Sequence, residues 1–323
     1  METLNWGILG TGLIAHEMAA ALQAVNGEIY AVCGTSMEKA ESFARECGVQ
    51  KAYGSADEML QDECVDIVYI ATPHNSHYEW MLKSLKAGKH VFCEKSVTVN
   101  SRQLEECAKL AQQKGLVICD GTTLLHMPLY KKLKQMITDG VIGDVKMIQV
   151  NFGSCKEYDV KNRFFSKELA GGALLDIGVY AASFARYFMK SRPDTVLTTA
   201  NYFETGVDET SGILLKNPDG EMAVIALTMR AKQPKRGVIA GEKGFIEIND
   251  YPRAQKASIT FTADGHTEVI EEGTSASALQ YEVQDMQDYV RNGNGAENLQ
   301  MVRDVMQTLT SVRSQWGMVY PFE

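Results

Sequence analysis

Residues 5–15 have the sequence NWGILGTGLIA, a short apolar run that ends in a glycine-rich turn. Gly10, Gly12 and Ala15 match the spacing G-x-G-x-x-G/A: the first glycine permits a tight strand-to-helix turn, the second lets backbone amides approach a pyrophosphate, and the small third residue lets the helix pack closely. Because a helix N-terminus favours an anion, we expect a dinucleotide phosphate to bind here. The residues expected to contact it are Gly10, Thr11, Gly12, Leu13 and Ile14.

Strand and helix patterns alternate along the first part of the chain. Apolar strands separated by helices of about ten residues imply right-handed crossovers and a parallel sheet covered on both faces. The sequence therefore predicts an α/β, doubly wound Rossmann domain over residues 1–122. After the first strand, the predicted strands are 28–34, 51–53, 65–71, 90–93 and 116–119, and the predicted helices are 13–25, 37–47, 56–61, 77–87 and 101–114.

The pattern changes in residues 123–323, where strand candidates dominate. Turn sequences such as Pro218-Asp219-Gly220 separate them and indicate antiparallel hairpins, so we expect an α+β domain. The predicted strands are 145–152, 195–203, 211–216, 221–229, 236–241, 245–248, 257–261 and 267–270, and the predicted helices are 129–138, 172–189, 279–291 and 297–315.

Composition excludes several classes of partner. The 323 residues carry a net charge of -9 with both signs mixed throughout, which argues against nucleic acid or an anionic membrane. No apolar run approaches the ~20 residues of a membrane span, and the first strand leaves no room for a signal peptide. Seven cysteines without a C-x-x-C pair favour free thiols in a reducing compartment. We expect a cytoplasmic protein without a metal site.

The end of the second strand bears on cofactor choice. Residues 33–37 contain no carboxylate to accept ribose hydroxyls, whereas Thr35, Ser36 and Lys39 offer hydroxyls and a positive charge. These groups suit a 2'-phosphate, so we expect NADP, with NAD as the alternative. A plainer interpretation, compatible with the first, is that Ser36 caps the next helix and Lys39 is solvated.

A proline- and histidine-containing loop follows the strand 65–71. Pro73 stiffens a loop expected to pass beneath the nicotinamide ribose, and His77 is expected to start the next helix. No Cys or carboxylate cluster accompanies the histidines, which disfavours a metal site. The expected cofactor-binding residues here are Thr72, Pro73, His74 and His77.

Two further groups of residues could carry chemistry. Glu94 and Lys95 follow the strand 90–93 at the binding edge of the sheet, where a lysine can donate to a carbonyl oxygen or lower the pKa of a nearby acid. Asp176 and Tyr180 are four residues apart, so on a helix they share one face. The alternatives are an exposed charged pair at Glu94 and Lys95, and a buried tyrosine with a hydrogen-bonded aspartate.

The motifs GILGTGLIA, TPHNSH, CEK (93–95) and GGALLDIGVY (171–180) together resemble the Gfo/Idh/MocA oxidoreductase family. GGALLDIGVY and ETGVDET (204–210) resemble the branch of dimeric dihydrodiol dehydrogenase and NADP-dependent D-xylose dehydrogenase. The resemblance implies that Lys95 and Tyr180 are catalytic, with Asp176 as their substrate-binding or orienting partner. It also implies cofactor contacts from Glu94 and Lys95, and an open antiparallel sheet that forms a homo-dimer or homo-tetramer.

The chain departs from the family pattern at several positions. Ser96 stands where proline is usual, so we expect the backbone that aims Lys95 to be less constrained. Thr123 and Leu125 replace a tryptophan and an arginine of the dihydrodiol branch, which makes an aromatic diol doubtful. His126 and Arg163 are further polar candidates, for which a surface location is at least as good an explanation.

The expected activity is hydride transfer between a nicotinamide and a small sugar, polyol or diol, with Tyr180 exchanging the hydroxyl proton beside Lys95. The alternatives are a catalytically silent NAD(P)-binding regulator and an NAD-assisted glycosidase.

Overall fold

The computed structural model describes residues 3–323, which form two compact units. The first contains the residues up to Gly121 together with Leu279–Gln300, and the second contains Thr122–Ala278 and Met301–Glu323. Each unit has its own sheet.

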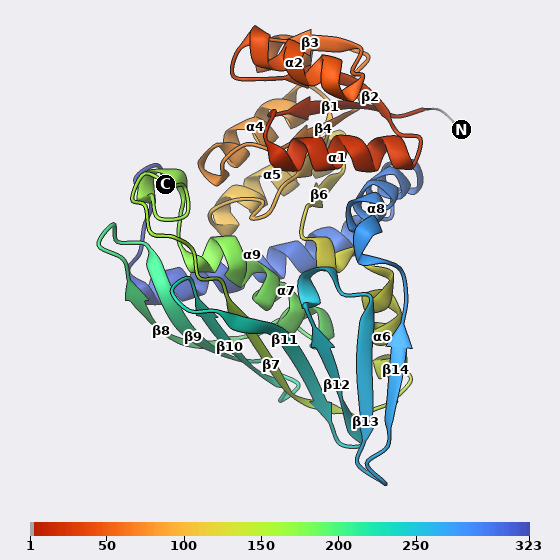
Figure 1. Cartoon of the computed structure of the whole chain (residues 1–323), viewed down its shortest axis with the longest axis vertical. Helices are drawn as coiled ribbons and strands as arrows, with labels where there is room; N and C mark the ends of the chain where they lie inside the picture. Colours follow the sequence, from red (N-terminus) through yellow and green to blue (C-terminus); the bar gives the residue numbers. More distant parts are fainter. Residues whose placement is uncertain (1–2) are drawn as a thin grey trace. The chain divides into compact units, whose positions relative to one another are not determined.

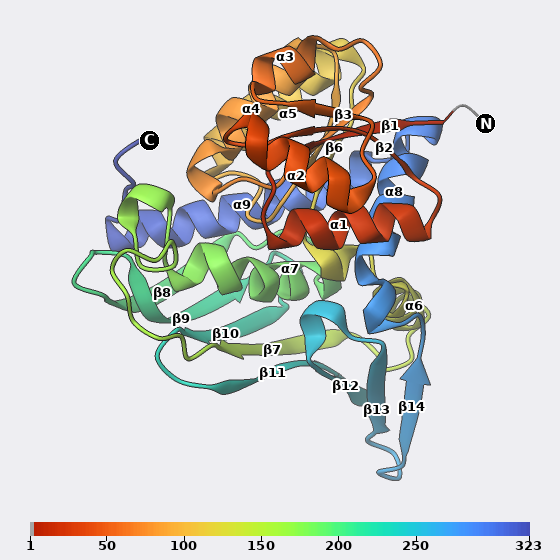
Figure 2. The same ribbon diagram turned by 45° about the horizontal axis from the view of Figure 1, so that its top comes forward.

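The first unit is built on a six-stranded parallel sheet with strand order β3-β2-β1-β4-β5-β6. Helix α1 packs beside α2, and α4 packs beside α3 and α5. Figures 1 and 2 show these two helix groups on opposite sides of the sheet, as the doubly wound prediction requires. The strands are β1 Asn5–Leu9, β2 Glu28–Cys33, β3 Lys51–Tyr53, β4 Ile67–Ile70, β5 His90–Cys93 and β6 Ile118–Asp120, and the helices are α1 Leu13–Ala24, α2 Met37–Cys47, α3 Ala56–Gln61, α4 His74–Lys86 and α5 Ser101–Lys114.

A late helix completes the core of the first unit. Helix α8 (Ala278–Asn292) contributes Leu279, Val283 and Met286, one apolar face at helical spacing, to the core that contains Trp6. The compact units are therefore discontinuous in sequence, whereas the predicted division into 1–122 and 123–323 is contiguous.

The second unit contains an eight-stranded sheet with order β14-β13-β12-β11-β7-β10-β9-β8. Strands β7 and β10 pair in parallel and the other neighbours pair antiparallel, so the sheet is mixed but mainly antiparallel, as predicted. The strands are β7 Val145–Gly153, β8 Thr195–Tyr202, β9 Asp208–Lys216, β10 Met222–Thr228, β11 Gln233–Gly241, β12 Gly244–Asn249, β13 Lys256–Phe261 and β14 Thr267–Glu271, and the main helices are α6 Pro128–Thr138, α7 Val179–Phe188 and α9 Ala296–Trp316.

One face of this sheet is covered by helix α7, which packs on β7 and β10 (Figure 1). Ile213 and Ile225 on the covered face are buried, whereas Leu197 and Val224 on the opposite face are 58% and 41% exposed. Leu197 and Val224 both pair with Leu214, so the three residues form an apolar row across β8, β9 and β10.

The helical stretch Lys167–Phe188 is long and apolar enough to match a membrane span by length and composition. Since 83% of that window is buried inside the protein, the stretch belongs to the core of the second unit.

The structure corrects two helix predictions. Helix α4 begins at His74, directly after Pro73, so His77 lies within the helix instead of starting it. Residues predicted as one α-helix over 172–189 form a π-helical segment, Leu174–Gly178, followed by α7. Periodicity over a few apolar residues does not separate these two helix types.

Candidate functional site

The glycine-rich turn after β1 has the shape that the fingerprint requires. Gly10 has φ +119°, and a Cβ on it would lie 2.6 Å from the carbonyl oxygen of Ala71, so only glycine fits. Gly12 is the N-cap of α1 and has no side-chain capping bond, and a Cβ built on it would meet open space. Ala15 is fully buried against the core. The uncapped amides and the open cradle suit a phosphate group.

The residues at the end of β2 are exposed and serve the next helix. Ser36 caps α2, its hydroxyl accepting a hydrogen bond of 3.4 Å from the amide of Lys39. Thr35 and the Lys39 side chain lie at the surface beside this cap. Helix capping therefore explains a serine at position 36. The cap uses only the backbone amide of Lys39, so the Lys39 side chain stays accessible to a ligand.

The two histidines of α4 hold the backbone that follows β5. His74 Nε2 lies 3.0 Å from the carbonyl oxygen of Lys95, and His77 Nδ1 lies 2.9 Å from that of Ser96. The other ring nitrogen of His77 lies 2.8 Å from the carbonyl oxygen of Thr72. The buried Ser96 and its neighbour are therefore held from α4, and the expectation that Ser96 constrains this backbone less than a proline would stays a prediction.

The same contacts give the histidines a structural function. His77 is fully buried and both of its ring nitrogens face backbone carbonyls. Among residues 3–323, no group of three or more His, Cys, Asp or Glu side chains could hold a metal ion.

Glu94 and Lys95 lie at the carboxyl edge of the parallel sheet, both half-buried. The hydroxyl of Tyr69 donates a hydrogen bond of 2.6 Å to Glu94 Oε1. Burial raises the pKa of Glu94, and the hydrogen bond from Tyr69 and the charge of Lys95 oppose this shift. Sequence reasoning did not single out Tyr69, which is hidden within an apolar strand.

In the second unit, the motif GGALLDIGVY forms a crowded turn followed by the π-helical segment. A Cβ on Gly171 would lie 2.7 Å from the carbonyl oxygen of Arg163, and Gly172 has φ +115°. Both positions therefore require glycine, and the turn leads directly into Leu174–Gly178. Single-turn π-helical segments are frequent at functional sites.

Asp176 and Tyr180 come from this segment and the first turn of α7. Asp176 is 7% exposed and its Oδ1 lies 3.8 Å from Nη2 of Arg163. Tyr180 is half-buried, with its ring centroid 6.3 Å from that of Phe152. Arg163 is thus the partner of a candidate residue, and its contact with Asp176 could not be found from sequence spacing.

His126 differs from expectation, since it is fully buried instead of lying at the surface. Another residue that sequence reasoning quoted without a function is Asp208, at the start of β9. Its Oδ2 accepts a hydrogen bond of 2.7 Å from the amide of Leu174.

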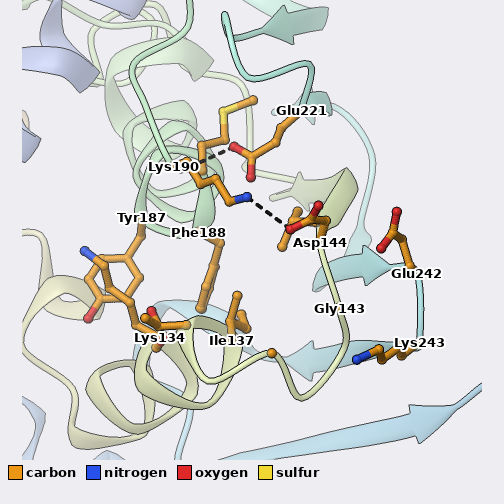
Figure 3. A pocket seen from close by; sticks show the side chains of 14 residues that line it. Lys134, Ile137, Gly143, Asp144, Tyr187, Phe188, Lys190, Glu221, Glu242 and Lys243 are labelled. Carbon is orange, nitrogen blue, oxygen red and sulfur yellow. Dashed lines mark hydrogen bonds and ion pairs between the residues drawn. The ribbon is translucent and has the colours of Figure 1, made fainter.

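A pocket of 520 Å³ lies elsewhere in the second unit, at the C-terminal end of α7. Figure 3 shows that Tyr187 and Phe188 line it from that helix. Lys190 borders it, with its amide bonded to Glu221 and its ammonium 3.1 Å from Asp144. The pocket is lined by none of the predicted site residues.

Family models match both parts of the chain. Residues 4–122 match the model described as "Oxidoreductase family, NAD-binding Rossmann fold", and residues 130–247 match the "GFO/IDH/MocA C-terminal domain". The chain belongs to the Gfo/Idh/MocA oxidoreductase family. It is an NAD(P)-dependent oxidoreductase, as the resemblance implied.

Curated relatives include trans-1,2-dihydrobenzene-1,2-diol dehydrogenases. The Xenopus laevis protein is 36% identical over 251 residues, 76% of each chain, and the Homo sapiens protein is 30% identical over 249 residues, 76% of this chain and 74% of the relative. These Gfo/Idh/MocA relatives are dehydrogenases acting on CH–OH groups.

Solved structures share the fold. A levoglucosan dehydrogenase in complex with NADH and levoglucosan has a TM-score of 0.89 at 18% identity and covers 99% of this chain and 100% of its own. A 3-ketoreductase from Actinomadura kijaniata in complex with NADP and TDP-benzene has a TM-score of 0.85 at 22% identity, covering 97% and 98%. At these identities the likeness shows the fold alone.

Proposed function

We propose that this Gfo/Idh/MocA protein is a dehydrogenase or reductase that interconverts a hydroxyl and a carbonyl on a small sugar, polyol or diol. The observation that carries the proposal is the placement of Lys95, which follows β5 at the binding edge of an NAD-binding domain and whose backbone is fixed by His74 and His77. A fixed backbone at Lys95 sets the point from which its side chain reaches a substrate.

The proposed division of labour follows the family resemblance. A bound nicotinamide supplies or accepts the hydride. Tyr180 exchanges the hydroxyl proton, and the ammonium of Lys95 favours the phenolate form that accepts it. Asp176 orients the substrate hydroxyls, with its carboxylate held beside Arg163.

We propose NADP as the preferred cofactor and the glycine-rich turn as its phosphate site. The support is the open cradle at Gly12, the uncapped N-terminus of α1, and the exposed Lys39 after β2. The lack of a carboxylate at residues 33–37 removes the usual acceptor for the ribose hydroxyls of NAD.

We propose a sugar or polyol over an aromatic diol. The dihydrodiol branch carries a tryptophan and an arginine where this chain has Thr123 and Leu125, so an aromatic wall is missing. The substrates to test include dihydrodiols, for which the curated relatives are named, and levoglucosan, with which one structural neighbour was solved.

We also propose that the protein works in the cytoplasm. A further proposal is that the chain forms a homo-dimer or homo-tetramer through the sheet of the second unit. The support is the apolar row Leu197, Leu214 and Val224 on the face away from α7. Light scattering of the wild type and of Val224→Glu tests it, since a charge in the row should yield monomer.

The decisive experiment measures binding and then turnover. Thermal shift with NADPH and NADH identifies the cofactor, and a panel of sugars, polyols and trans-dihydrodiols is then oxidised while reduced cofactor is followed by absorbance. We expect cofactor release in step with product and preference for NADP. Cofactor binding without turnover of any panel member would favour a regulator, and glycoside cleavage without released reduced cofactor would favour a glycosidase.

A further inference from the structure

The helix that carries Asp176 and Tyr180 receives no cap from its own sequence. Gly171, Gly172 and Ala173 precede it, and Ala173 at the N-cap position makes no side-chain capping bond. The amide of Leu174 instead donates to Asp208 Oδ2 at 2.7 Å, across 34 residues of sequence. A helix N-terminus favours a carboxylate both as a hydrogen-bond acceptor and as a negative charge.

The fit between Asp208 and the turn is close. Asp208 is fully buried, and a Cβ on Gly172 would lie 2.2 Å from its Oδ1. Within the described part of the chain, Oδ1 makes no hydrogen bond. Glycine at position 172 therefore makes room for this carboxylate as well as supplying a positive φ.

A second contact fixes the same turn from the end of the chain. The hydroxyl of the buried Tyr320 donates a hydrogen bond of 2.8 Å to the carbonyl oxygen of Gly171. Arg313 stacks on the Tyr320 ring at 4.6 Å and pairs with Glu323 at 2.7 Å. The contact of Tyr320 with Gly171 and that of Asp208 with Leu174 therefore fix the turn on both sides of Gly172.

We propose that Asp208 is a positioning residue for the proposed reaction: it fixes the N-terminus of the helix that presents Asp176 and Tyr180. The inference rests on the proposed function, because it takes those two residues as part of the reaction. Loss of the Asp208 cap lets the first turn of this helix move, and the side chains of Asp176 and Tyr180 then lose their fixed direction.

The charge of this cap changes near neutral pH. Burial raises the pKa of Asp208 to about 7, opposed by the amides of Leu174, Asp208 and Ala173 and by the charge of Arg313. Tyr202 of β8 and Tyr320 also face it: burial raises the pKa of both phenols, and the charge of Asp208 adds to each shift. The capping charge is therefore gained as pH rises through about 7.

The test compares Asp208→Ala, which removes the acceptor, with Asp208→Asn, which keeps an acceptor oxygen but cannot titrate. Glu209→Gln is the matched control, since Glu209 is adjacent and its carboxylate lies at 3.9 Å from Arg230. Hydrogen exchange of the backbone amides of residues 172–180 measures how well the N-terminus of the helix is held, and it needs no turnover. Steady-state kinetics over pH 6–8 measure the effect of the Asp208 cap on kcat.

For Asp208→Ala we expect exchange at Leu174 to rise about tenfold, and kcat to fall by about tenfold or more with the KM for NADPH unchanged. Asp208→Asn should keep the protection and hold kcat near the value of the wild type at pH 6, without the rise in kcat between pH 6 and 8. If Asp208→Ala does not fold, the pH profile of Asp208→Asn decides.

Wild-type exchange in Asp208→Ala, or a pH profile of Asp208→Asn identical to that of the wild type, would overturn the proposal. Failure of the proposed function is distinguishable: the wild type would then turn over no member of the substrate panel, while the exchange experiment would still report the cap.

Discussion

His77 Nδ1 lies 2.9 Å from the carbonyl oxygen of Ser96, and this contact joins α4 to the segment that carries Lys95. The imidazole is fully buried, and its other nitrogen reaches Thr72. One side chain thus ties together the loops that follow β4 and β5, at the edge where a doubly wound sheet binds its ligand.

His77→Ala should destabilise the first unit and lower turnover. The buried carbonyl of Ser96 and the part-buried carbonyl of Thr72 lose their contact with the imidazole and a cavity remains, which together cost about 2–4 kcal/mol of unfolding free energy. Urea unfolding measures the loss. His266→Ala is the control, because the exposed His266 contacts Asp264 in the β13–β14 hairpin and its loss should cost under about 0.5 kcal/mol. Equal stability of the two variants would contradict the structural function of His77.

Lys95→Met should lower kcat by about a hundredfold or more while the protein still binds NADPH. Methionine keeps about the same length of side chain but removes the ammonium to which we assign a part in the proton transfer. Turnover and thermal shift with NADPH separate chemistry from binding. Lys109→Met on the exposed face of α5 is the control. Near-normal turnover of Lys95→Met would rule out the proposed role.

Tyr180→Phe should lower kcat by about 10²–10⁴-fold, because it removes the hydroxyl that we propose exchanges the proton. The ring and its contact with Phe152 remain, so the melting temperature should change little. Tyr187→Phe, two turns further along α7, serves as the control. Equal turnover of the two variants would contradict the proposed role of Tyr180.

Ser36→Asp should shift cofactor preference towards NADH. Aspartate caps a helix as well as serine does, so α2 keeps its N-cap, while the new carboxylate repels a 2'-phosphate and accepts ribose hydroxyls. We expect the ratio of kcat/KM for NADPH over NADH to fall about tenfold or more. Ser36→Ala controls for loss of the cap, which costs about 1 kcal/mol. A wild type that already prefers NADH would refute the assignment of Lys39.

Asp208→Asn should change how stability depends on pH. The pKa of Asp208 is about 7 in the folded state against an ordinary value of 3.8, so between these values the folded state holds a proton that the unfolded state has released. The wild type therefore loses stability as pH rises from about 4 to about 7, by up to about 1.4 kcal/mol per pH unit, and Asp208→Asn lacks this loss. Its melting temperature relative to the wild type should rise across this window and level off above it. A difference in melting temperature between the two proteins that stays constant from about pH 4 to about pH 7 would show that Asp208 does not titrate in this range.

The sequence by itself determined what neighbouring residues control. The glycine spacing predicted the turn after β1 because Gly10 and Gly12 act within one turn, through φ and through the space that a missing Cβ leaves. Periodicity predicted the alternating strands and helices, and the conjunction of motifs predicted the family, because these signals are local and occur in a fixed order.

Only the tertiary structure decided which distant side chains complete those local elements. The contacts of His77 with Ser96, of Asp208 with Leu174 and of Arg163 with Asp176 join residues 13–34 positions apart. Helix α8 likewise joins a core formed from the start of the chain. Such contacts depend on strand order and on which face of an element is buried, and no local spacing encodes either.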